Sequence, residues 1–502
     1  MLSSKVNRRG FVASSALATV ATVVPRSVLG GPGFVPPSEK IHIGYVGCGT
    51  QGLRQLMQAL PRQEIRIVAV CDPNRKSEDY PEWGPREIVS KVRAFLEDPR
   101  WGEGARGGLC GREVGLEIVS RYYAKASDNA TERPQCRAYS DFRQMLADER
   151  DLDAVYIMTP DHLHGVIAAR ALKAGKHAIT HKPISNVLQE VRILRDLAQQ
   201  TGLATQLFCA ADNPDAATIA EWIQAGAIGQ VREVHNWSTR PFWPQGMTEY
   251  PTEKVPVPDG FEWDLWLGPA QERPYHPAYT HAVFRGWYDF GTGALGDMGH
   301  YSFYQIFKIL GLGSPVSVEA SRSQFWRIEN YTWKKQINRV SYPRASLIHW
   351  EFPSSDRRSA VKLHWYDGGL RPELLAELEV DGLDMPEEGM LFVGDQGKIL
   401  AGFTGNNPRL IPQKRMKDFQ PPPKRLPRPA GELDQFIRAC RGEAKADANF
   451  VSVYPMAETI LLGTIAVRVN QKLRWDTTRG EFTNSAEANA LIRRENRPGW
   501  EL

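Results

Sequence analysis

IHIGYVGCGTQG, residues Ile41–Gly52, reads as a short apolar strand that runs directly into a glycine-rich turn. The turn has the spacing G-x-G-x-x-G, and apolar residues follow it at helical intervals. In such a unit the first glycine permits the sharp turn, the second lets the backbone approach a pyrophosphate, and the third lets helix and strand pack closely. The helix N-terminus also offers unpaired N–H groups to phosphates. The stretch therefore predicts a dinucleotide-binding turn formed by Gly47, Gly49, Thr50, Gln51 and Gly52.

A second apolar run, residues 65–70, is followed closely by Asp72. Asp72 comes 20 residues after Gly52, where a carboxylate accepts hydrogen bonds from an adenosine ribose. The alternative is that Asp72 only starts the next turn. A carboxylate at this position favours NAD, but Arg75 and Lys76 follow closely and keep NADP open.

The composition is that of a globular protein with room for two or three domains. The chain has 502 residues, of which 42% are hydrophobic and 24% charged. The formal charge is +4, but residues 1–30 hold four basic residues and no acid, so the remainder carries 4 − 4 = 0. A neutral remainder gives no overall attraction to nucleic acid or to anionic membranes.

The N-terminus is typical of an export signal. Residues 7–12, with Arg8 and Arg9, resemble the twin-arginine motif, and an apolar run follows to Val24. The run is short for a bilayer span, and no cysteine precedes Cys48, so we expect no stable membrane anchor. Residues 1–37 are predicted to be a signal and linker read by the twin-arginine machinery, which would place the protein in the periplasm. The alternative is an apolar tail that carries two arginines by chance.

From residue 38 to residue 208, expected strands alternate with expected helices, which predicts a parallel sheet and a Rossmann domain. The strands are expected at 41–46, 65–70, 153–159, 177–180 and 204–208, with a glycine-rich loop at 102–111. The helices are expected at 86–96, 113–126, 141–147 (capped by Ser140), from after His164 to Ala174, and at 187–200. Ligands bind at the carboxyl ends of such strands, where Thr159, Pro160, His181 and Lys182 fall.

Residues 209–502 have a different sequence pattern from residues 38–208, because expected strands follow one another and most of the tryptophans lie here. This pattern predicts an α/β domain with an open, mostly antiparallel sheet. Strands are expected at 231–239, 346–352, 360–366 and 390–393, and helices at 296–310, 431–441 and 453–469. The six cysteines and the histidines show no metal-binding spacing. An oxidising compartment would allow Cys110 and Cys136 to pair, but nothing in the sequence requires this disulfide.

Two groups of residues are candidates for proton transfer. Lys182 lies between a strand end and a proline, where it can hold a hydroxyl or alter a pKa, although a solvated lysine is the simpler interpretation. Asp297 and Tyr301 are four residues apart and share one helix face. The alternative is that Asp297 caps the helix and Tyr301 packs in the core. Trp237, Trp243, Trp287, Arg240 and Arg285 fall in segments expected near the site.

The chain resembles the Gfo/Idh/MocA oxidoreductases from residue 41 onward. The motifs that carry the resemblance are VGCGTQG, VCDP, DAVYIMTPDHLH, ALKAGKHAITHKPIS and GTGALGDMGHY. The resemblance implies that Thr159, Pro160 and His164 line the nicotinamide side. It also implies that Lys182 binds substrate and assists proton transfer, and that Asp297 is the active-site aspartate.

The chain departs from the family pattern at two positions. His181 stands where the family has a glutamate, so we expect the pKa of Lys182 to be lower than in its relatives. Tyr301 stands where many members have the catalytic histidine, and His300 lies one residue earlier. Either residue can be the acid or base, and Tyr301 is favoured because it occupies the position of the family's histidine.

The expected function is an exported NAD(P)-dependent oxidoreductase that acts on a sugar, polyol or sugar derivative, with the cofactor retained tightly if free NAD is scarce. One alternative is glycoside cleavage through a transient keto-sugar with no net redox change. A second is a non-catalytic, nucleotide-bound sugar-binding protein. By resemblance we also expect a homo-oligomer formed through the open sheet.

Overall fold

The computed structural model describes residues 35–126 and 135–502. Residues 41–502 form one compact unit, and the 3-10 helix η1 (Pro37–Glu39) precedes it in the sequence. The twin-arginine motif and the apolar run after it lie outside the described residues. Within the described ranges, no helix combines the length and apolar character needed to cross a membrane.

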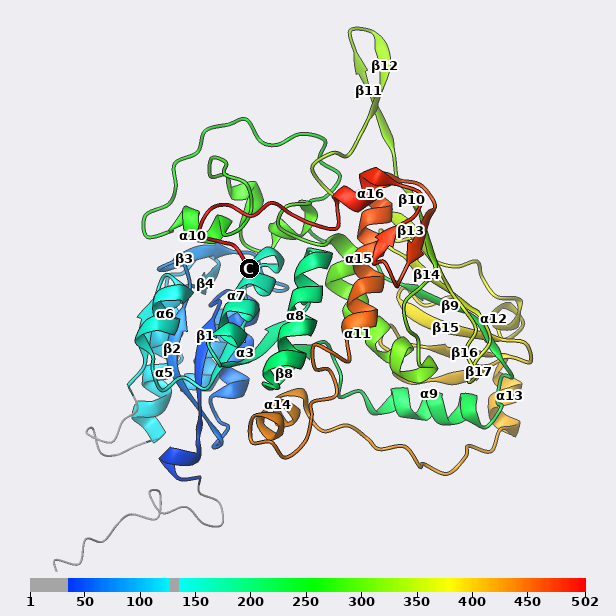
Figure 1. Cartoon of the computed structure of the whole chain (residues 1–502), viewed down its shortest axis with the longest axis horizontal. Coiled ribbons are helices and arrows are strands. Elements are labelled where there is room, and N and C mark those ends of the chain that lie inside the picture. The colour runs from blue at the N-terminus through cyan, green and yellow to red at the C-terminus, as the bar shows by residue number, and fades with distance from the viewer. Residues whose placement is uncertain (1–34, 127–134) are drawn as a thin grey trace, which may run out of the picture. The chain divides into compact units, whose positions relative to one another are not determined.

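Six parallel strands form the first sheet in the order β5-β2-β1-β6-β7-β8 (Figure 1). They are β1 (Ile41–Val46), β2 (Ile65–Cys71), β5 (Arg137–Tyr139), β6 (Ala154–Ile157), β7 (His177–His181) and β8 (Thr205–Phe208). The chain runs outward from β1 in one direction and then, from β6, in the other, which is the doubly wound order of dinucleotide-binding folds. The predicted Rossmann fold is confirmed. The order reverses between β1 and β6, so the ligand crevice is expected at their carboxyl ends.

Helices link the parallel strands, as the alternating pattern predicted. They are α3 (Thr50–Ala59), α5 (Arg112–Ala126), α6 (Phe142–Asp148), α7 (Asp161–Lys173) and α8 (Leu188–Thr201). The expected cap of α6 was wrong by one residue: Asp141 rather than Ser140 is the N-cap, and its carboxylate accepts a hydrogen bond from the Arg143 N–H at 2.8 Å. Both residue types can cap, and only the side chain at the N-cap position reaches the N–H two residues on.

A long segment between β2 and β5 folds over the end of the first sheet. It contains β3 (Ser77–Tyr80), α4 (Glu87–Leu96) and β4 (Gly108–Cys110). The expected glycine-rich loop therefore includes a strand, and β4 pairs with β3 in antiparallel fashion. A Cβ on Gly107 would lie 2.5 Å from the Glu78 carbonyl oxygen, so glycine is needed for this close approach.

The second sheet has nine strands in the order β17-β16-β15-β9-β14-β13-β10-β18-β19. They are β9 (Val231–Trp237), β10 (Ser317–Arg322), β13 (Ser346–Phe352), β14 (Val361–Tyr366), β15 (Gly389–Gly394), β16 (Lys398–Ala401), β17 (Arg409–Ile411), β18 (Leu473–Asp476) and β19 (Glu481–Phe482). Every neighbouring pair is antiparallel except β9 and β14. The predicted open, mostly antiparallel sheet is confirmed.

Two helices, α11 (Gly293–Leu310) and α15 (Tyr454–Val469), cover one face of the second sheet (Figure 1). Phe303 of α11 packs edge-on against Trp350 and Trp365, with ring centroids 5.4 and 5.9 Å apart. The remaining helices are α9 (Pro214–Gln224), α10 (Trp263–Leu267), α12 (Ala376–Val380), α13 (Gln413–Asp418), α14 (Glu432–Cys440), α16 (Ala486–Ala490), η3 (Pro277–Tyr279) and η4 (Val283–Gly286). The opposite face of the second sheet, called the outer face below, carries only a small apolar cluster in which Leu378 of α12 takes part.

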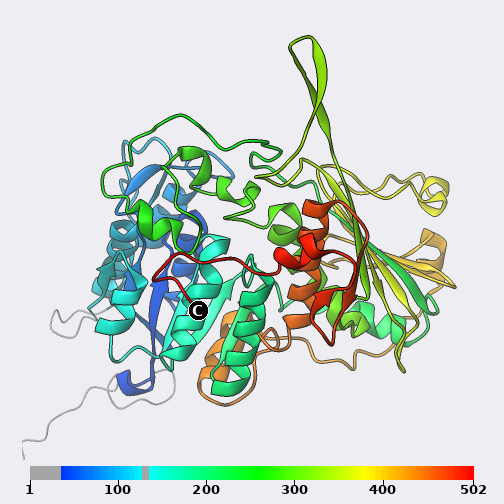
Figure 2. The ribbon, with the colours of Figure 1, turned by 45° about the horizontal axis from the view of Figure 1, so that its top comes forward.

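A two-stranded hairpin, β11 (Phe325–Glu329) and β12 (Thr332–Gln336), projects away from the second sheet (Figures 1 and 2). Asn330 and Tyr331 form its turn with φ values of 50° and 60°, as a tight hairpin turn requires. Trp326 and Trp333 are 55% and 67% exposed. Aromatic exposure of this kind is typical of interaction surfaces.

The C-terminal part of the chain returns to the first sheet. The Leu207 N–H in β8 donates to the Ala448 carbonyl at 2.8 Å, and Phe436 of α14 is buried in the core beside β1 and β2. The six cysteines are free thiols, so the pairing considered for Cys110 and Cys136 does not form.

Candidate functional site

The glycine-rich turn between β1 and α3 has no room for side chains. Gly47 has a φ of 103°, and a Cβ there would lie 2.5 Å from the Met158 carbonyl. A Cβ on Gly52 would lie 2.1 Å from the Gly47 oxygen, and one on Gly49 would lie 3.0 Å from the Tyr80 ring. The first and third glycines are therefore required by the backbone, in the way that the dinucleotide-binding turn requires them.

The N-terminus of α3 suits a phosphate. Gly49 is the N-cap and gives no side-chain hydrogen bond, so the first N–H groups of the helix keep their donors free for a ligand. The Tyr45 hydroxyl donates to the Gly52 carbonyl at 2.6 Å and fixes the turn from behind. Thr50 and Gln51 line the same cavity as the glycines. These residues fit the pyrophosphate of a dinucleotide.

Asp72 closes the turn from the end of β2. Its two carboxylate oxygens accept hydrogen bonds from the N–H groups of Cys48 (2.7 Å) and Asn74 (2.8 Å). Burial raises its pKa, and these two N–H groups act against that rise. Asp72 thus forms the turn that the simpler interpretation assigned to it, and it also lines the cavity. Each oxygen keeps a lone pair that a ribose hydroxyl can use.

One cavity of about 330 Å³ joins the glycine-rich turn to the helix face of α11. Among the residues predicted from the sequence, it is lined by Gly47, Gly49, Thr50, Gln51, Gly52, Asp72, Thr159, Pro160, His181, Lys182, Asp297 and Tyr301. His164 and His300 are absent from its lining. The volume falls in the range of ligand pockets, roughly 300–1,000 Å³.

His164 supports the cavity from within α7. Its ring nitrogens lie 2.5 Å from the Pro183 carbonyl oxygen and 2.8 Å from that of Thr159. Both contacts favour the protonated ring, but burial outweighs them and lowers the pKa to about 4. His164 therefore joins the loop after β6 to the loop after β7, and its contact with a ligand is indirect.

Lys182, Asp297 and Arg285 form a buried charge cluster at the far end of the cavity. Oδ1 of Asp297 accepts from Lys182 Nζ and, at 2.8 Å, from Arg285 Nε. Although burial acts to raise it, the pKa of Asp297 lies well below its usual range because the two cations are adjacent. Among the described residues none donates to Oδ2 of Asp297, so this oxygen remains free for a ligand.

The pKa of Lys182 is lowered, first by burial and then by the charge of Arg285, while Asp297 opposes the shift. The expected difference between this lysine and that of its relatives, attributed to His181, stays a prediction. Burial also lowers the pKa of His181 well below its usual value, so that ring is neutral beside the amine. A neutral histidine in place of a glutamate leaves Lys182 with one carboxylate partner in direct contact.

Tyr301 lies on the α11 face that also carries Asp297, as their spacing predicted. Its hydroxyl is 3.3 Å from Nε2 of His181, and Lys182 Nζ lies 5.0 Å from the centre of its ring. Burial and the charge of Asp297 raise the pKa of Tyr301 well above its usual value. The phenol therefore keeps its proton near pH 7 and can donate a hydrogen bond.

His300 faces away from this group. Its Nδ1 lies 2.7 Å from the Gly296 carbonyl oxygen within the same helix, and its side chain is fully buried. Burial lowers its pKa to about 3. In this arrangement Tyr301 contacts the cavity and His300 does not.

Several residues of the cavity were not predicted as site residues. Asp161 at the start of α7 accepts a hydrogen bond from the Thr292 hydroxyl at 2.7 Å, and burial raises its pKa to about 6. Tyr80, Trp83 and His281 come from the segment between β2 and β5 and from the loop before η4. Trp243, Arg240 and Arg285, which were considered from the sequence, do line the cavity, whereas Trp237 and Trp287 are buried in apolar clusters.

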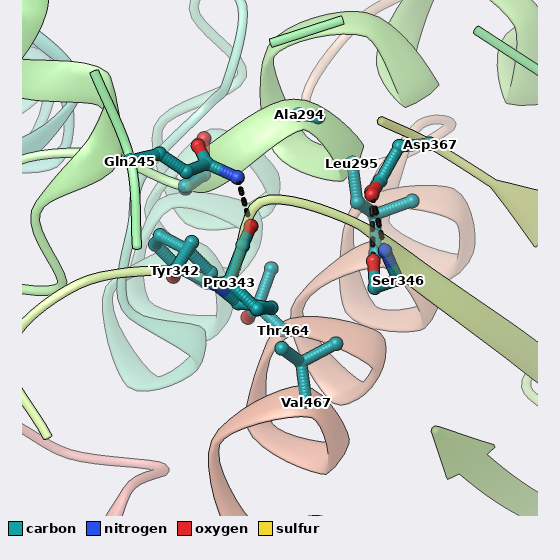
Figure 3. A pocket seen from close by; sticks show the side chains of 10 residues that line it. Gln245, Ala294, Leu295, Tyr342, Pro343, Ser346, Asp367, Thr464 and Val467 are labelled. Carbon is teal, nitrogen blue, oxygen red and sulfur yellow. Dashed lines mark hydrogen bonds between the residues drawn. The ribbon is translucent and has the colours of Figure 1, made fainter. Parts of the chain in front are cut away.

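A second, very small cavity lies beside the start of α11, between that helix, β13 and α15 (Figure 3). Its volume of about 10 Å³ suits at most a water molecule. Asp367 accepts hydrogen bonds there from the Ser346 N–H (2.6 Å) and hydroxyl (2.7 Å). These contacts join the start of β13 to the turn after β14.

Two family models match the chain. The model of the GFO_IDH_MocA_C2 oxidoreductase family, C-terminal alpha/beta domain, matches residues 220–345 and 365–502, which is more than half of the chain. The GFO_IDH_MocA model, an NAD-binding Rossmann fold of the oxidoreductase family, matches residues 112–208.

Individual relatives are similar over shorter stretches. An uncharacterized oxidoreductase of Rhizobium meliloti is 36% identical over 24% of this chain and 37% of its own length. A levoglucosan dehydrogenase of Pseudarthrobacter phenanthrenivorans is 32% identical over 20% of this chain and 27% of its own length. The chain thus aligns with about a third of these relatives.

The fold is similar to that of a WlbA dehydrogenase from Bordetella pertussis, whose crystal structure holds NADH and UDP-GlcNAcA. The TM-score is 0.51 at 14% identity, over 87% of this chain and 99% of that one. This likeness concerns the fold alone. Because the C-terminal family model covers more than half of the chain and the second model covers residues 112–208, the chain belongs to the Gfo/Idh/MocA oxidoreductase family.

Proposed function

We propose that the protein is an NAD(P)-dependent oxidoreductase that oxidises or reduces a hydroxyl-bearing carbon of a sugar, polyol or sugar derivative. The observation that carries the proposal is the single cavity that has a phosphate-binding turn at one end and the Lys182–Asp297–Tyr301 group at the other. A bound nicotinamide would supply the hydride acceptor or donor.

In the oxidative direction the chain must remove the hydroxyl proton as hydride leaves the same carbon. Lys182 suits this task because its pKa is displaced toward neutrality and its amine faces the cavity. The Tyr301 phenol donates a hydrogen bond to the reacting oxygen. Oδ2 of Asp297 accepts one from a neighbouring hydroxyl and so orients the substrate.

Other lining residues support a carbohydrate as substrate. Arg285 stacks over Trp243, with 5.7 Å from its guanidinium carbon to the ring centre. Arg240 lies 6.0 Å from the centre of the Trp83 ring, and both residues line the cavity. Aromatic faces beside fixed hydrogen-bond donors suit a molecule with apolar C–H faces and many hydroxyls.

NAD is the favoured cofactor because a 2′-phosphate would have to approach the Asp72 carboxylate. Arg75, which could offset this charge, is half-exposed and lies 3.9 Å from Glu113. The backbone N–H of Arg75 donates to the Gly260 carbonyl at 2.8 Å, so this N–H is not free to bind a phosphate.

The first test is to denature the purified protein and identify any released nucleotide by mass. Sugars and polyols are then screened for reduction of bound or added NAD, with Lys182→Met as the control that retains the glycine-rich turn. Turnover in the wild type and none in the variant supports the proposal. Failure of the wild type to bind either NAD or NADP overturns it.

The redox-neutral alternative has one specific observation in its favour. A glycosyl hydrolase family 109 protein of Shewanella amazonensis is 26% identical over 39% of this chain and 37% of its own length. Release of nitrophenol from a nitrophenyl glycoside, without accumulation of NADH, would favour this version over net oxidation.

We also propose export by the twin-arginine route and self-association, each as a separate expectation. Export is supported by Arg8 and Arg9 before an apolar run, and it predicts that Arg8→Lys with Arg9→Lys keeps the protein in the cytoplasmic fraction. Self-association is supported by the exposed aromatic hairpin β11–β12. Light scattering of the purified chain tests it, and a monomer at micromolar concentration would contradict it.

A further inference from the structure

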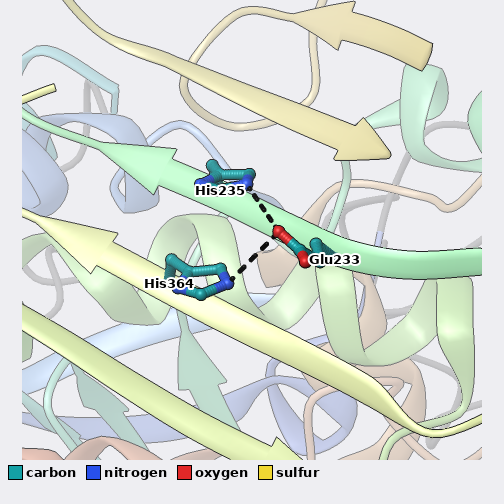
Figure 4. A group of neighbouring side chains, drawn as sticks. All are labelled: Glu233, His235 and His364. Carbon is teal, nitrogen blue, oxygen red and sulfur yellow. Dashed lines mark ion pairs between the residues drawn. The ribbon is translucent and has the colours of Figure 1, made fainter. Parts of the chain in front are cut away.

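Three histidines form a row across adjacent strands on the outer face of the second sheet. His349 of β13 is paired with His364 of β14, and His364 is paired with His235 of β9. Glu233 lies two residues before His235 and so points to the same face. Figure 4 shows the Glu233 carboxylate directed between the rings of His235 and His364.

The spacing of the three nearest side chains fits one metal ion. Oε2 of Glu233 lies 3.4 Å from Nε2 of His235 and 3.7 Å from Nε2 of His364, and all three ligand atoms lie within 4.8 Å of one another. A tetrahedral zinc ion with ligands at roughly 2.0–2.1 Å requires ligand atoms about 3.3 Å apart. Small side-chain rotations would bring the group to that geometry.

The neighbouring groups orient both rings for this role. Nδ1 of His235 lies 2.9 Å from the Tyr366 hydroxyl, and Nδ1 of His364 contacts Nδ1 of His349. When each Nδ1 carries the hydrogen, each Nε2 presents its lone pair to the space in front of Glu233. Nε2 of His364 is a buried atom that has no hydrogen-bond partner among the described residues.

The charges around the group also suit a cation. The Nε2 atoms of His235 and His364 both face the Glu233 carboxylate. Two neutral lone pairs facing a carboxylate repel it, and a cation between them removes this repulsion.

We propose that Glu233, His235 and His364 form a binding site for a first-row divalent cation, with Zn²⁺ favoured and a water molecule as the fourth ligand. Two imidazoles and one carboxylate are a ligand set that zinc accepts. None of the three residues lines the cavity with the glycine-rich turn. The ion would therefore fasten β9 to β14 without taking part in the proposed reaction.

The test uses the full chain without a histidine tag, freed of metal by a chelator and titrated with Zn²⁺ by calorimetry. Bound zinc is counted by mass spectrometry after dialysis. One ion per chain is expected in the wild type, and Glu233→Gln and His364→Gln are each expected to weaken binding by at least about 100-fold. His349→Gln should weaken it by roughly 10–100-fold, since it only orients a ligand.

Glu319→Gln is the matched control, because it removes an exposed carboxylate from the same row of the sheet. It is expected to bind Zn²⁺ as the wild type does. Co²⁺ provides a second readout, since a tetrahedral site gives intense visible absorption bands that Glu233→Gln should abolish. The proposal is overturned if the wild type retains no zinc, or if Glu233→Gln and His364→Gln bind as tightly as Glu319→Gln. Circular dichroism shows that each variant is folded.

Discussion

Lys182 and Asp297 form a buried ion pair that joins the end of β7 in the first sheet to α11 on the second. Their side chains are only 4% and 9% exposed. The same Asp297 oxygen also accepts from Arg285, so one carboxylate compensates two buried cations. Because the carboxylate is shared, we expect substitutions of the three residues to differ in their effects on protein stability and on catalysis.

The first prediction is that Asp297→Asn destabilises the protein more than Lys182→Met. The first change leaves Lys182 and Arg285 buried without their shared carboxylate. The second leaves Asp297 paired with Arg285 at 2.8 Å. Removing one partner of a buried ion pair costs about 3–5 kcal/mol, and we expect Asp297→Asn in that range and Lys182→Met below it. Urea unfolding of both variants measures the difference.

The double variant Lys182→Met with Asp297→Asn serves as the control for this argument. Since it removes both charges of the pair, its loss of stability should be smaller than the sum of the two single losses. Equal losses in the two single variants would contradict the shared role of Asp297.

The second prediction concerns Tyr301 and His300. Tyr301→Phe keeps the ring beside Lys182 but removes the hydroxyl that lies 3.3 Å from His181. We expect kcat to fall by roughly 10²-fold or more with little change in NAD affinity. His300→Gln is expected to lower stability, because His300 is fully buried, and to change kcat much less. The reverse order of the two kcat values would make His300 the acid or base.

The third prediction is that Gly52→Ala abolishes NAD binding. A Cβ there would lie 2.1 Å from the Gly47 oxygen, so the turn must open to admit it. Overpacking of this kind costs about 1–3 kcal/mol and would displace the N–H groups of α3. Fluorescence titration with NAD and thermal unfolding measure the two effects. Gly84→Ala is the matched control, because apart from its chain neighbours no atom lies within 4 Å of the added Cβ. If Gly52→Ala bound NAD as tightly as Gly84→Ala does, the assignment of the glycine-rich turn to NAD binding would be wrong.

Most of the first sheet could be predicted from the sequence, because the spacing of apolar residues and the position of turn residues agree there. The buried strands expected in residues 41–208 alternate with helices, and this alternation indicates a parallel sheet with right-handed crossovers. The sequence prediction missed β3 to β5 and β16 to β19, because strands of two to four residues carry too few alternations to be distinguished from loops. The six-residue strand β10 was also missed. So were β11 and β12, whose apolar residues are exposed rather than buried.

The site was predictable where residues follow strand ends and not where distant loops meet. Lys182 and Thr159 end strands, and Asp297 and Tyr301 share a helix face. Trp83 and His281 are far apart in the sequence and reach the same cavity only through the packing of irregular loops. The row of His235 and His364 was invisible for a related reason, since strand register alone brings the two residues together.

The fourth prediction concerns the stability of the protein between about pH 4.5 and pH 7. Glu432 at the start of α14 accepts hydrogen bonds from the N–H groups of Cys209 (2.7 Å) and Ala211 (2.9 Å). Burial raises its pKa from 4.5 to about 7. In this window the folded state keeps the proton that the unfolded state has lost. The contribution of Glu432 to stability is therefore present at low pH and is lost as the pH rises, by about 1.4 kcal/mol per unit.

Glu432→Gln tests this sign, because an amide oxygen accepts the same two hydrogen bonds and does not ionise. Relative to the wild type, we expect the variant to gain stability as the pH rises from 4.5 to 7 and to keep that gain above pH 7. Urea unfolding at several pH values measures the difference. Glu221→Gln is the control of opposite sign, because hydrogen bonds from Arg428 lower the pKa of Glu221 to about 2. This variant should be less stable than the wild type near neutral pH, and the difference in stability should disappear only in acid. A difference between wild type and Glu432→Gln that does not change with pH would mean that Glu432 stays ionised in the folded protein, and that its bonds to Cys209 and Ala211 outweigh its burial.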